Sequence, residues 1–339
     1  MARILVTGGA GMIGANLTSR LVALGHSVVV VDNLWRGQRE NLATGDGWLI
    51  DMATDFHDRD LSEAGMLDPL LPGCDYVFHL ADVVAGIGYV FANQQFIYRQ
   101  NLLINTRVLE SVAKARWLKG YIYVGTACSF PQQLQTGPDA APLRETDLLP
   151  AHPESPYGWS KLIGMLEAEA MQAETGIPIA LPVLHNVYGP PSDISPERAQ
   201  VIPALVRRTI ELPDHGDLVV WGTGAQGRAF LHVNDVVDGL VAVMERGLGR
   251  GIIQLGPDHC TTIREVAETV TRLSGRNIGI RYDTTKPTGD LGRCADYAKA
   301  RDLLDWSPRV GLSDGLAELY AWVEARLSAA EDTLPRRAG

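Results

Sequence analysis

Cysteine is scarce in this sequence, with four residues at positions 74, 128, 260 and 294 of 339. They lie far apart and form no Cys-x-x-Cys pair, which argues against a zinc module or a disulfide framework and favours a reducing cytoplasm. The eight histidines show no His-x-x-x-His or His-Glu-x-x-His spacing. We therefore predict no metal site.

Long apolar runs and an excess of basic residues are also missing. No apolar run approaches the ~18 residues of a membrane span, and a glycine-rich turn begins within eight residues of the start, where a signal peptide would need an apolar core. Thirty Lys and Arg against 40 Asp and Glu give a net charge of −10, so nucleic acids and anionic membranes are poor partners. We expect a cytoplasmic protein without nucleic-acid or membrane partners.

The composition that remains, 46% hydrophobic and 21% charged, is typical of a globular protein with one large domain or two coupled ones. Short apolar runs alternate with helical stretches, which indicates βαβ units and a parallel sheet. The predicted strands are 4–6, 27–31, 76–80, 121–124 and 179–183, and the predicted helices are 12–24, 101–115 and 157–174. The predicted fold class is α/β, a Rossmann-type doubly wound parallel sheet with a smaller α+β substrate-binding lobe.

Near residue 186 the regular alternation of predicted strands and helices gives way to a mixture of helices and short strands. We predict a first domain over 1–185, to which a segment of about 228–250 returns, a second lobe over 186–330, and a tail over 331–339. A proline-rich stretch, 131–156, should be an irregular loop. In the second half we predict helices at 201–210, 234–245, 263–273, 298–304 and 311–327, and strands near 218–220, 251–254 and 278–282.

A glycine-rich turn, Thr7-Gly-Gly-Ala-Gly-Met-Ile-Gly14, links the first predicted strand to the first helix. Glycines at 8, 11 and 14 permit a tight turn and close approach of the backbone to a pyrophosphate, and the helix N-terminus offers free N–H groups to the phosphates. Asp32 ends the second strand, 18 residues after Gly14. A carboxylate there accepts from ribose hydroxyls and repels a 2′-phosphate, which favours NAD over NADP. Arg36 leaves NADP open, and Asp51 is a candidate for the adenine.

A second motif, Tyr157-Gly-Trp-Ser-Lys161, stands at the start of a predicted helix. Residues four apart lie on one helical face. An ammonium beside a phenol favours the phenolate, so the pair can act as a general base.

These stretches occur together with Asp32-Asn33, His79-Leu-Ala-Asp82, Asn101, Thr126, Asn186-Val-Tyr-Gly-Pro190 and Gly227-Arg-Ala-Phe-Leu-His-Val233. Over residues 3 to about 325 the chain resembles the extended short-chain dehydrogenases/reductases, the family of NAD-dependent nucleotide-sugar epimerases and dehydratases. The resemblance implies that Thr126 hydrogen-bonds the reacting hydroxyl, Tyr157 takes its proton and Lys161 holds a cofactor ribose. The predicted NAD site is Gly8, Gly11, Met12, Ile13, Gly14, Asp32, Asn33, Arg36, Asp51, Met52, Leu80, Ala81, Asn101, Tyr157 and Lys161.

The segment Thr126-Ala-Cys-Ser-Phe-Pro131 is similar to one in GDP-mannose 3,5-epimerases and GDP-fucose synthases, whose cysteine exchanges protons beside a transient ketone. That resemblance makes Cys128 a catalytic candidate with Thr126, Tyr157 and Lys161. In those families a His or Lys precedes the proline that matches Pro203, whereas this sequence has Gln200 in that stretch. Glu197, His185 or water could replace it.

The predicted substrate site comprises Gly86, Ser129, Asn186, Val201, Arg228 and Arg293, with Arg207 and Arg208 as further phosphate candidates. Arginine binds phosphate oxygens through charge-assisted hydrogen bonds. We predict an NAD-dependent nucleotide-sugar epimerase, with a GDP-sugar favoured. A 4-epimerase, a dehydratase and a non-catalytic NAD-binding regulator stay open. The family resemblance also suggests a homodimer through the predicted helices 101–115 and 157–174.

Overall fold

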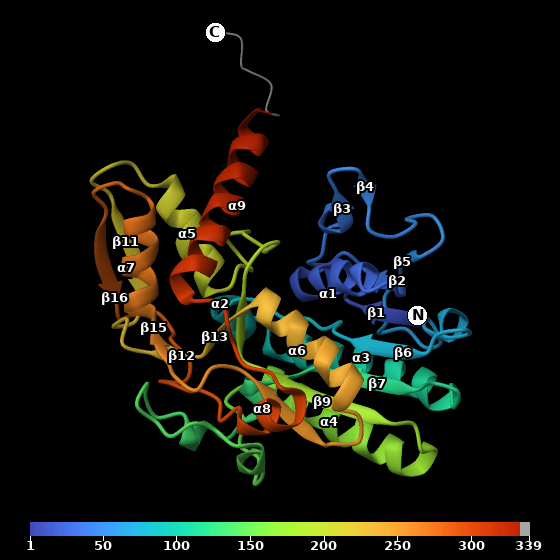
Figure 1. Cartoon of the computed structure of the whole chain (residues 1–339). Coiled ribbons are helices and arrows are strands. Elements are labelled where there is room, and N and C mark those ends of the chain that lie inside the picture. The colour runs from blue at the N-terminus through green and yellow to red at the C-terminus, as the bar shows by residue number, and fades with distance from the viewer. Residues whose placement is uncertain (333–339) are drawn as a thin grey trace.

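The computed structural model describes residues 1–332, so the predicted tail lies almost entirely outside the described residues. Seven parallel strands follow one another in a central sheet in the order β14-β9-β7-β6-β1-β2-β5, and β8 pairs with β9 (Figure 1). Their bounds are β1 Arg3–Thr7, β2 Ser27–Asp32, β5 Phe56–Asp58, β6 Tyr76–His79, β7 Gly120–Tyr123, β8 Gly125–Thr126, β9 Ile179–Leu184 and β14 Ile252–Leu255. The predicted doubly wound parallel sheet is confirmed.

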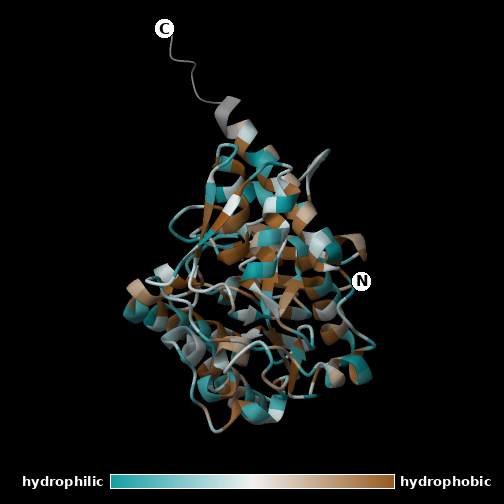
Figure 2. Cartoon of the chain, turned by 90° about the vertical axis from the view of Figure 1, so that its left-hand side faces the viewer, coloured by the Kyte–Doolittle hydropathy of each residue, from teal (hydrophilic) through white to brown (hydrophobic). Residues whose placement is uncertain are grey.

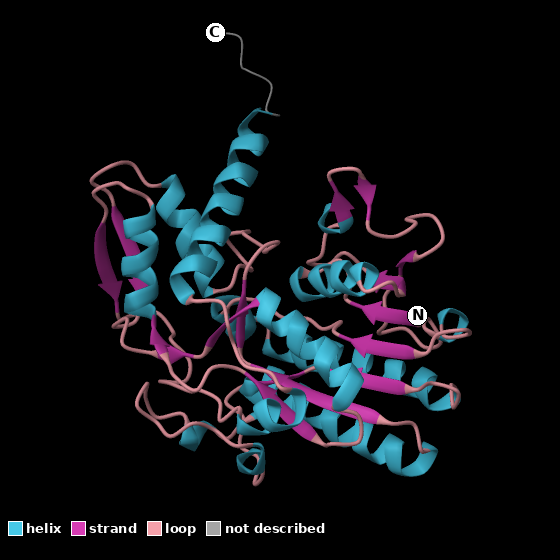
Figure 3. Ribbon diagram, viewed as in Figure 1, coloured by secondary structure: helices cyan, strands magenta, loops and turns pink. Residues whose placement is uncertain are grey.

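Helices cover both faces of this sheet (Figure 3). One face carries α1 (Met12–Ala23), α6 (Val233–Arg246) and α8 (Ala298–Leu304), and the other carries α3 (Gln94–Lys114) and α4 (Pro156–Thr175). Alternate residues of β1 serve the two cores, because Ile4 and Val6 pack on the α1 side and Leu5 on the α3 side. Burial on both faces explains why the strands are continuous apolar runs.

Two features of this domain differ from the prediction made from the sequence. The strand at 252–255, which its surroundings assigned to the smaller lobe, joins the main sheet beside β9. Helix α3 begins at Gln94 rather than at 101, and no side-chain cap marks its start. The short edge strand β5 and the helix α2 (Ile87–Ala92) were not predicted.

The smaller lobe has its own core, built on α5 (Val201–Glu211), α7 (Ile263–Leu273) and α9 (Leu312–Asp332). These helices pack with a parallel pair, β11 (Asp217–Trp221) and β16 (Gly279–Asp283). A capping box between Thr262 and Glu265 starts α7. The helices carry both brown and teal segments in Figure 2, as expected for helices that bury one face.

Short strand pairs complete the chain. They are β3 (Ala43–Thr44) with β4 (Gly47–Trp48), β10 (Asn186–Tyr188) with β13 (Phe230–His232), and β12 (Gly227–Arg228) with β15 (Thr261–Thr262). The stretch 131–156 is irregular as predicted, apart from 3-10 turns at Gln132–Leu134 and Glu145–Leu148. No helix within residues 1–332 is both long and apolar enough to span a membrane.

Two of the buried histidines, His79 and His185, are neutral imidazoles. His79 lies between Thr7 Oγ1 (2.8 Å from Nδ1) and Asn105 Oδ1 (3.1 Å from Nε2), and burial lowers its pKa to about 3. Burial also lowers the pKa of His185, whose Nε2 is 3.0 Å from Gln254 Oε1, to about 4. Below the unfolded pKa of about 6.5 the unfolded chain binds protons that the folded chain does not. The free energy of unfolding therefore decreases as the pH is lowered.

We expect this effect to be measurable at His79. Between pH 7 and pH 5 each neutral histidine should lower the free energy of unfolding by about 2 kcal/mol. Urea unfolding of the wild type and of His79→Gln at both pH values isolates the contribution of one residue, because all other titrating groups are shared. The variant should lose about 2 kcal/mol less than the wild type over this interval. An equal loss in the two proteins would contradict the assignment of His79 as a neutral imidazole.

Candidate active site

A cavity of about 850 Å³ opens where the carboxyl ends of the sheet strands meet the smaller lobe. The strand order reverses between β1 and β6, which is where ligands bind in open parallel sheets. Most of the predicted site residues line this cavity. They are Gly8, Gly11, Met12, Ile13, Gly14, Asp32, Asn33, Arg36, Leu80, Ala81, Gly86, Thr126, Cys128, Tyr157, Lys161, Asn186, Val201, Arg228 and Arg293.

The glycine turn leaves no room for side chains. Gly8 has φ +69°, and a Cβ on it would lie 2.9 Å from the backbone nitrogen of Ala81. A Cβ on Gly14 would lie 2.2 Å from the carbonyl oxygen of Gly8. Gly11 caps α1 without a side-chain hydrogen bond, so N–H groups of the first turn remain available to a pyrophosphate. The turn therefore fits a dinucleotide.

Asp32 ends β2 beside this turn. Its carboxylate accepts hydrogen bonds from the backbone N–H of Ala10 (3.0 Å) and of Leu34 (2.8 Å), which fixes its orientation at the cavity. Burial raises the pKa of Asp32. Arg36, the residue that left NADP open, points elsewhere: its guanidinium lies 3.5 Å from Asp193 Oδ2 and donates to the carbonyl of Val84 (3.1 Å). This arrangement favours NAD.

Four predicted residues do not line the cavity. Asp51 is exposed and accepts from the N–H of Ala53, and Met52 packs against the α1 side of the core. Asn101 is fully buried, and its amide bonds both backbone groups of Val83, so it holds the loop after β6 rather than lining the cavity. Ser129 is also buried and donates to the carbonyl of Gly158 (3.1 Å), which fixes the first turn of α4.

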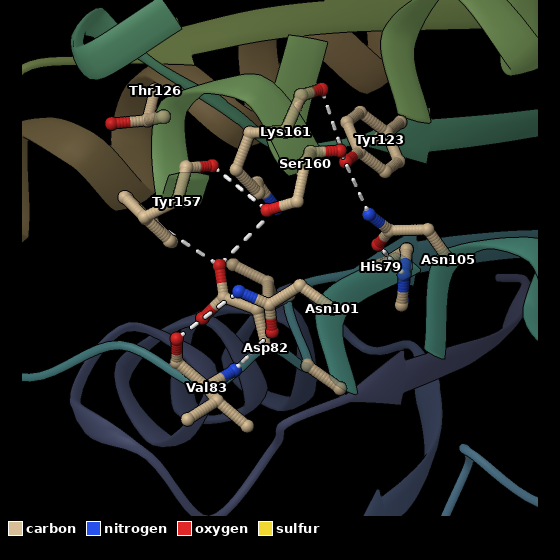
Figure 4. Close-up of polar contacts among 12 residues, drawn as sticks. His79, Asp82, Val83, Asn101, Asn105, Tyr123, Thr126, Tyr157, Ser160 and Lys161 are labelled. Carbon is tan, nitrogen blue, oxygen red and sulfur yellow. Dashed lines mark hydrogen bonds and ion pairs between the residues drawn. The ribbon is translucent and has the colours of Figure 1, made fainter. Parts of the chain in front are cut away.

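Tyr157 and Lys161 lie one turn apart on α4, as predicted, and Asp82 lies between their polar ends (Figure 4). The Tyr157 hydroxyl donates to Asp82 Oδ2 (3.3 Å), and Lys161 Nζ is 3.2 Å from the same oxygen. Lys161 is buried and also lies over the ring of Tyr123, 4.6 Å from its centroid. Ser155 caps α4 by accepting from the N–H of Gly158.

The carboxylate of Asp82 alters the expected electrostatics. Burial raises the pKa of Tyr157 well above its usual value, and the negative charge of Asp82 adds to the shift. The sequence had predicted a phenolate stabilised by Lys161, without a counter-charge. Asp82 stood in the His79–Asp82 stretch, but nothing in its spacing showed that it would reach α4.

Thr126 and Cys128 form a short turn at the end of β8. The backbone N–H of Cys128 donates to Thr126 Oγ1 (3.3 Å). A Cβ on Gly158 would lie 2.1 Å from the carbonyl oxygen of Cys128, so this turn packs directly on the start of α4. The thiol thereby shares the cavity with Tyr157.

Arg293 reaches the thiol from the smaller lobe. Its Nη2 donates to Cys128 Sγ (3.2 Å), while its Nη1 donates to Asp290 Oδ2 (2.9 Å) and Gln135 Oε1 (2.8 Å). The side chain is only 6% exposed. Nearby, Arg228 donates to the carbonyls of Gly227 (2.7 Å) and Thr288 (3.2 Å). Burial lowers the pKa of Arg228 to about 10, which leaves it cationic at neutral pH.

The other predicted substrate residues have simpler surroundings. Asn186 Oδ1 is buried, and among the described residues no group donates to it. Val201 begins α5, and Gln200 precedes it at the cavity wall. Arg207 and Arg208 also line the cavity, but their guanidinium groups donate to the carbonyls of Ile194 and Val219.

The substitutes considered for the missing His or Lys differ in suitability. Glu197 is exposed at the cavity wall. His185 is neutral at physiological pH, since burial lowers its pKa to about 4, and its Nε2 is occupied by Gln254. Glu154, Asp290 and Gln135 were not singled out from the sequence, although Glu154 and Asp290 line the cavity.

Comparison with known proteins agrees with this geometry. The sequence model of the NAD dependent epimerase/dehydratase family matches residues 4–256. The chain is 29% identical to GDP-mannose 3,5-epimerase 1 of Oryza sativa subsp. japonica over 327 residues, covering 96% of the chain and 82% of that protein. It is 34% identical to GDP-L-fucose synthase 1 of Arabidopsis thaliana over 246 residues, covering 70% and 74%.

Solved structures show the same architecture. UDP-glucose 4-epimerase from Thermotoga maritima, with UDP-glucose, superimposes with a TM-score of 0.82 at 26% identity, covering 96% of this chain and 99% of that one. DesIV, a dTDP-glucose 4,6-dehydratase from Streptomyces venezuelae with NAD bound, gives 0.81 at 26% identity, covering 96% and 98%. The resemblance predicted from the sequence is confirmed, NAD is the cofactor, and the chain belongs to the NAD-dependent epimerase/dehydratase family.

Proposed function

We propose that this chain is a nucleotide-sugar epimerase that retains NAD, works through a transient 4-keto sugar and exchanges a proton at C3 or C5 through Cys128. The observation that carries the proposal is the 3.2 Å contact between Arg293 Nη2 and Cys128 Sγ, in the cavity that also holds Thr126, Tyr157 and Lys161. A guanidinium at this distance stabilises a thiolate, the form that removes protons.

The oxidation step assigns roles to the residues around Tyr157. When bound, NAD supplies the reversible oxidation of the sugar hydroxyl to a ketone. Thr126 orients this hydroxyl and Tyr157 takes its proton, while Lys161 holds a ribose hydroxyl of the cofactor. Asp82 bridges Tyr157 and Lys161 and keeps both side chains at the cavity wall.

The second step assigns a role to the thiol. A carbonyl at C4 acidifies the protons at C3 and C5, and a thiolate of Cys128 removes one of them. Arg293 is itself fixed by Asp290 and Gln135, so its charge stays beside the sulfur through the reaction. The guanidinium itself is buried, which strengthens its interaction with the sulfur.

The substrate side is consistent with a nucleotide diphosphate sugar. Arg228 is a buried cation at the cavity wall, and Asn186 Oδ1, which accepts no hydrogen bond from the described residues, can accept from a sugar hydroxyl. We favour a GDP-sugar, because the relatives with similar sequences include a GDP-mannose 3,5-epimerase and GDP-L-fucose synthases. Two alternatives on the same fold are a 4-epimerase, as in the Thermotoga structure, and a dehydratase, as in DesIV.

Turnover in deuterated water separates these activities. We would incubate the NAD-loaded protein with GDP-mannose, UDP-glucose and dTDP-glucose and analyse the sugar ring by NMR and mass spectrometry. Deuterium at C3 or C5 is expected. Inversion at C4 without label would indicate a 4-epimerase, and loss of water would indicate a dehydratase. Tight NAD binding without any turnover would favour the regulatory protein.

We also propose the predicted homodimer through α3 and α4, two long helices that pack against each other on one face of the sheet. Analytical ultracentrifugation tests it. The cytoplasmic location and the domain bounds remain predictions from the sequence.

A further inference from the structure

Glu154 is a carboxyl group in the cavity for which the proposed function has given no role. It lies three residues before Tyr157, is half-buried and lines the same cavity as Cys128. The backbone N–H of Asp290 donates to its Oε2 (3.2 Å). A Cβ added to Gly289 would lie 3.5 Å from the same oxygen and 3.4 Å from Arg228 Nη2, so the segment that carries Asp290 packs closely on Glu154.

The Asp290 carboxylate lacks one hydrogen bond that Glu154 can supply. Asp290 is 5% exposed, and its Oδ2 accepts from Arg293 Nη1 (2.9 Å). The other carboxylate oxygen, Oδ1, is buried and accepts no hydrogen bond from any donor within residues 1–332. A buried acceptor without a donor is costly, and a protonated carboxyl group is a donor. Burial raises the pKa of Glu154 to about 7, and the charge of Asp290 and a hydrogen bond between the two side chains contribute to the rise.

Charge balance is compatible with the same protonation state. The groups around Glu154 are the cations Arg228 and Arg293 and the acids Asp290 and Cys128. Two guanidinium groups are balanced by two anions, so one of these three acids keeps its proton, and burial together with the charge of Asp290 favours Glu154 as that acid. The cavity would then hold a base, the thiolate, and an acid, the Glu154 carboxyl group, at the same time. Inverting a carbon requires this pair, and Gln200 cannot supply the acid.

We propose that Glu154, held by Asp290, is the second acid–base group of the site and delivers the proton that completes inversion. The inference rests on the proposed function. The Cys128 thiolate removes a proton beside the ketone, so a C–H bond breaks, an S–H bond forms and the electron pair moves to the carbonyl oxygen as an enolate. The O–H bond of Glu154 then breaks as a C–H bond forms on the other face of the carbon, and the ketone returns. Exchange with water restores the thiolate and the carboxyl group.

The test uses NAD-loaded wild type, Glu154→Gln and Glu197→Gln with GDP-mannose in deuterated water. The glutamine of the first variant keeps an acceptor for the Asp290 N–H, and NAD content together with the melting temperature reports on folding. In Glu154→Gln the exchange of deuterium at C3 or C5 should persist, because Cys128 can remove and return a proton on one face. Inversion should fall at least about 100-fold. Glu197→Gln should invert like the wild type.

The outcomes separate this inference from the proposed function. No exchange in the wild type would overturn both. Exchange in the wild type together with normal inversion in Glu154→Gln would overturn the role of Glu154 alone, and loss of inversion in Glu197→Gln would transfer it to Glu197.

A measurement without sugar gives an independent readout. The infrared C=O band of a protonated carboxyl group should titrate with a midpoint near pH 7 in the NAD-loaded wild type and should be missing in Glu154→Gln. Asp290→Asn removes a negative charge beside Glu154, so the midpoint should move to lower pH. A wild-type spectrum with no such band at pH 6 would overturn the proposal.

Discussion

Replacing Tyr157 with phenylalanine should lower the turnover of the nucleotide sugar by about 1,000-fold, the middle of the range for loss of a positioned acid–base group. The substitution removes one oxygen atom, whose hydrogen bond to Asp82 Oδ2 is its only one among the described residues. The aromatic ring stays in place, so NAD binding should persist. Product formation followed by NMR and cofactor content measured after gel filtration test the two expectations. A variant that keeps more than a tenth of the wild-type rate would exclude Tyr157 as the base.

Asp82→Asn is the matched variant for this experiment. The asparagine can still accept from Tyr157 and Lys161 through its carbonyl oxygen but carries no charge. Burial and then the charge of Asp82 raise the pKa of Tyr157, so removing the charge should lower that pKa. The pH profile of sugar oxidation should therefore move to lower pH. An unchanged profile would show that Tyr157 does not titrate in the step that limits oxidation.

Cys128→Ala should reduce deuterium exchange at C3 and C5 by at least about 1,000-fold, while reversible oxidation at C4 continues. The reason is spatial: the thiol is the group that Arg293 holds in the cavity, and Tyr157 serves the hydroxyl oxygen rather than a ring carbon. Mass spectrometry of the recovered sugar measures the exchange.

Cys260→Ala provides the control for this substitution. Cys260 is half-buried and does not line the cavity, so its removal should leave the exchange at the wild-type rate. Full exchange in Cys128→Ala would disprove the role of the thiol, and loss of exchange in both variants would point to a structural effect of removing a cysteine.

The sequence predicted the parts of the structure that depend on local patterns. The strand-turn-helix around Gly8–Gly14, the position of Asp32 and the shared face of Tyr157 and Lys161 follow from spacing along a strand or a helix. Contacts between distant segments do not. Arg293 and Cys128 are 165 positions apart, and the thiol was predicted to be catalytic without any indication that a guanidinium would hold it.

The remaining differences from the prediction concern residues that belong to recognisable sequence motifs but contact residues far away in the sequence. Asn101 belongs to a family motif, yet it bonds the loop after β6 instead of lining the cavity. Asp82 and Glu154 belong to stretches that the sequence analysis used, but their partners on α4 and beside Asp290 depend on tertiary packing. Residues 252–255 showed the composition of a strand, although no local feature told which sheet the strand joins.

The return of the chain to the main sheet has a consequence for biosynthesis. Helix α6 packs against α1, and β14 pairs with β9, yet both are made after the whole of α5 and β11. While the chain emerges from the ribosome, the apolar surface that α6 later covers is open to water and to other nascent chains. Helix α8 covers the same face of the sheet, so the cofactor lobe completes its packing only after residue 304 has been synthesised. A fragment that stops at residue 185 should therefore associate with chaperones or aggregate.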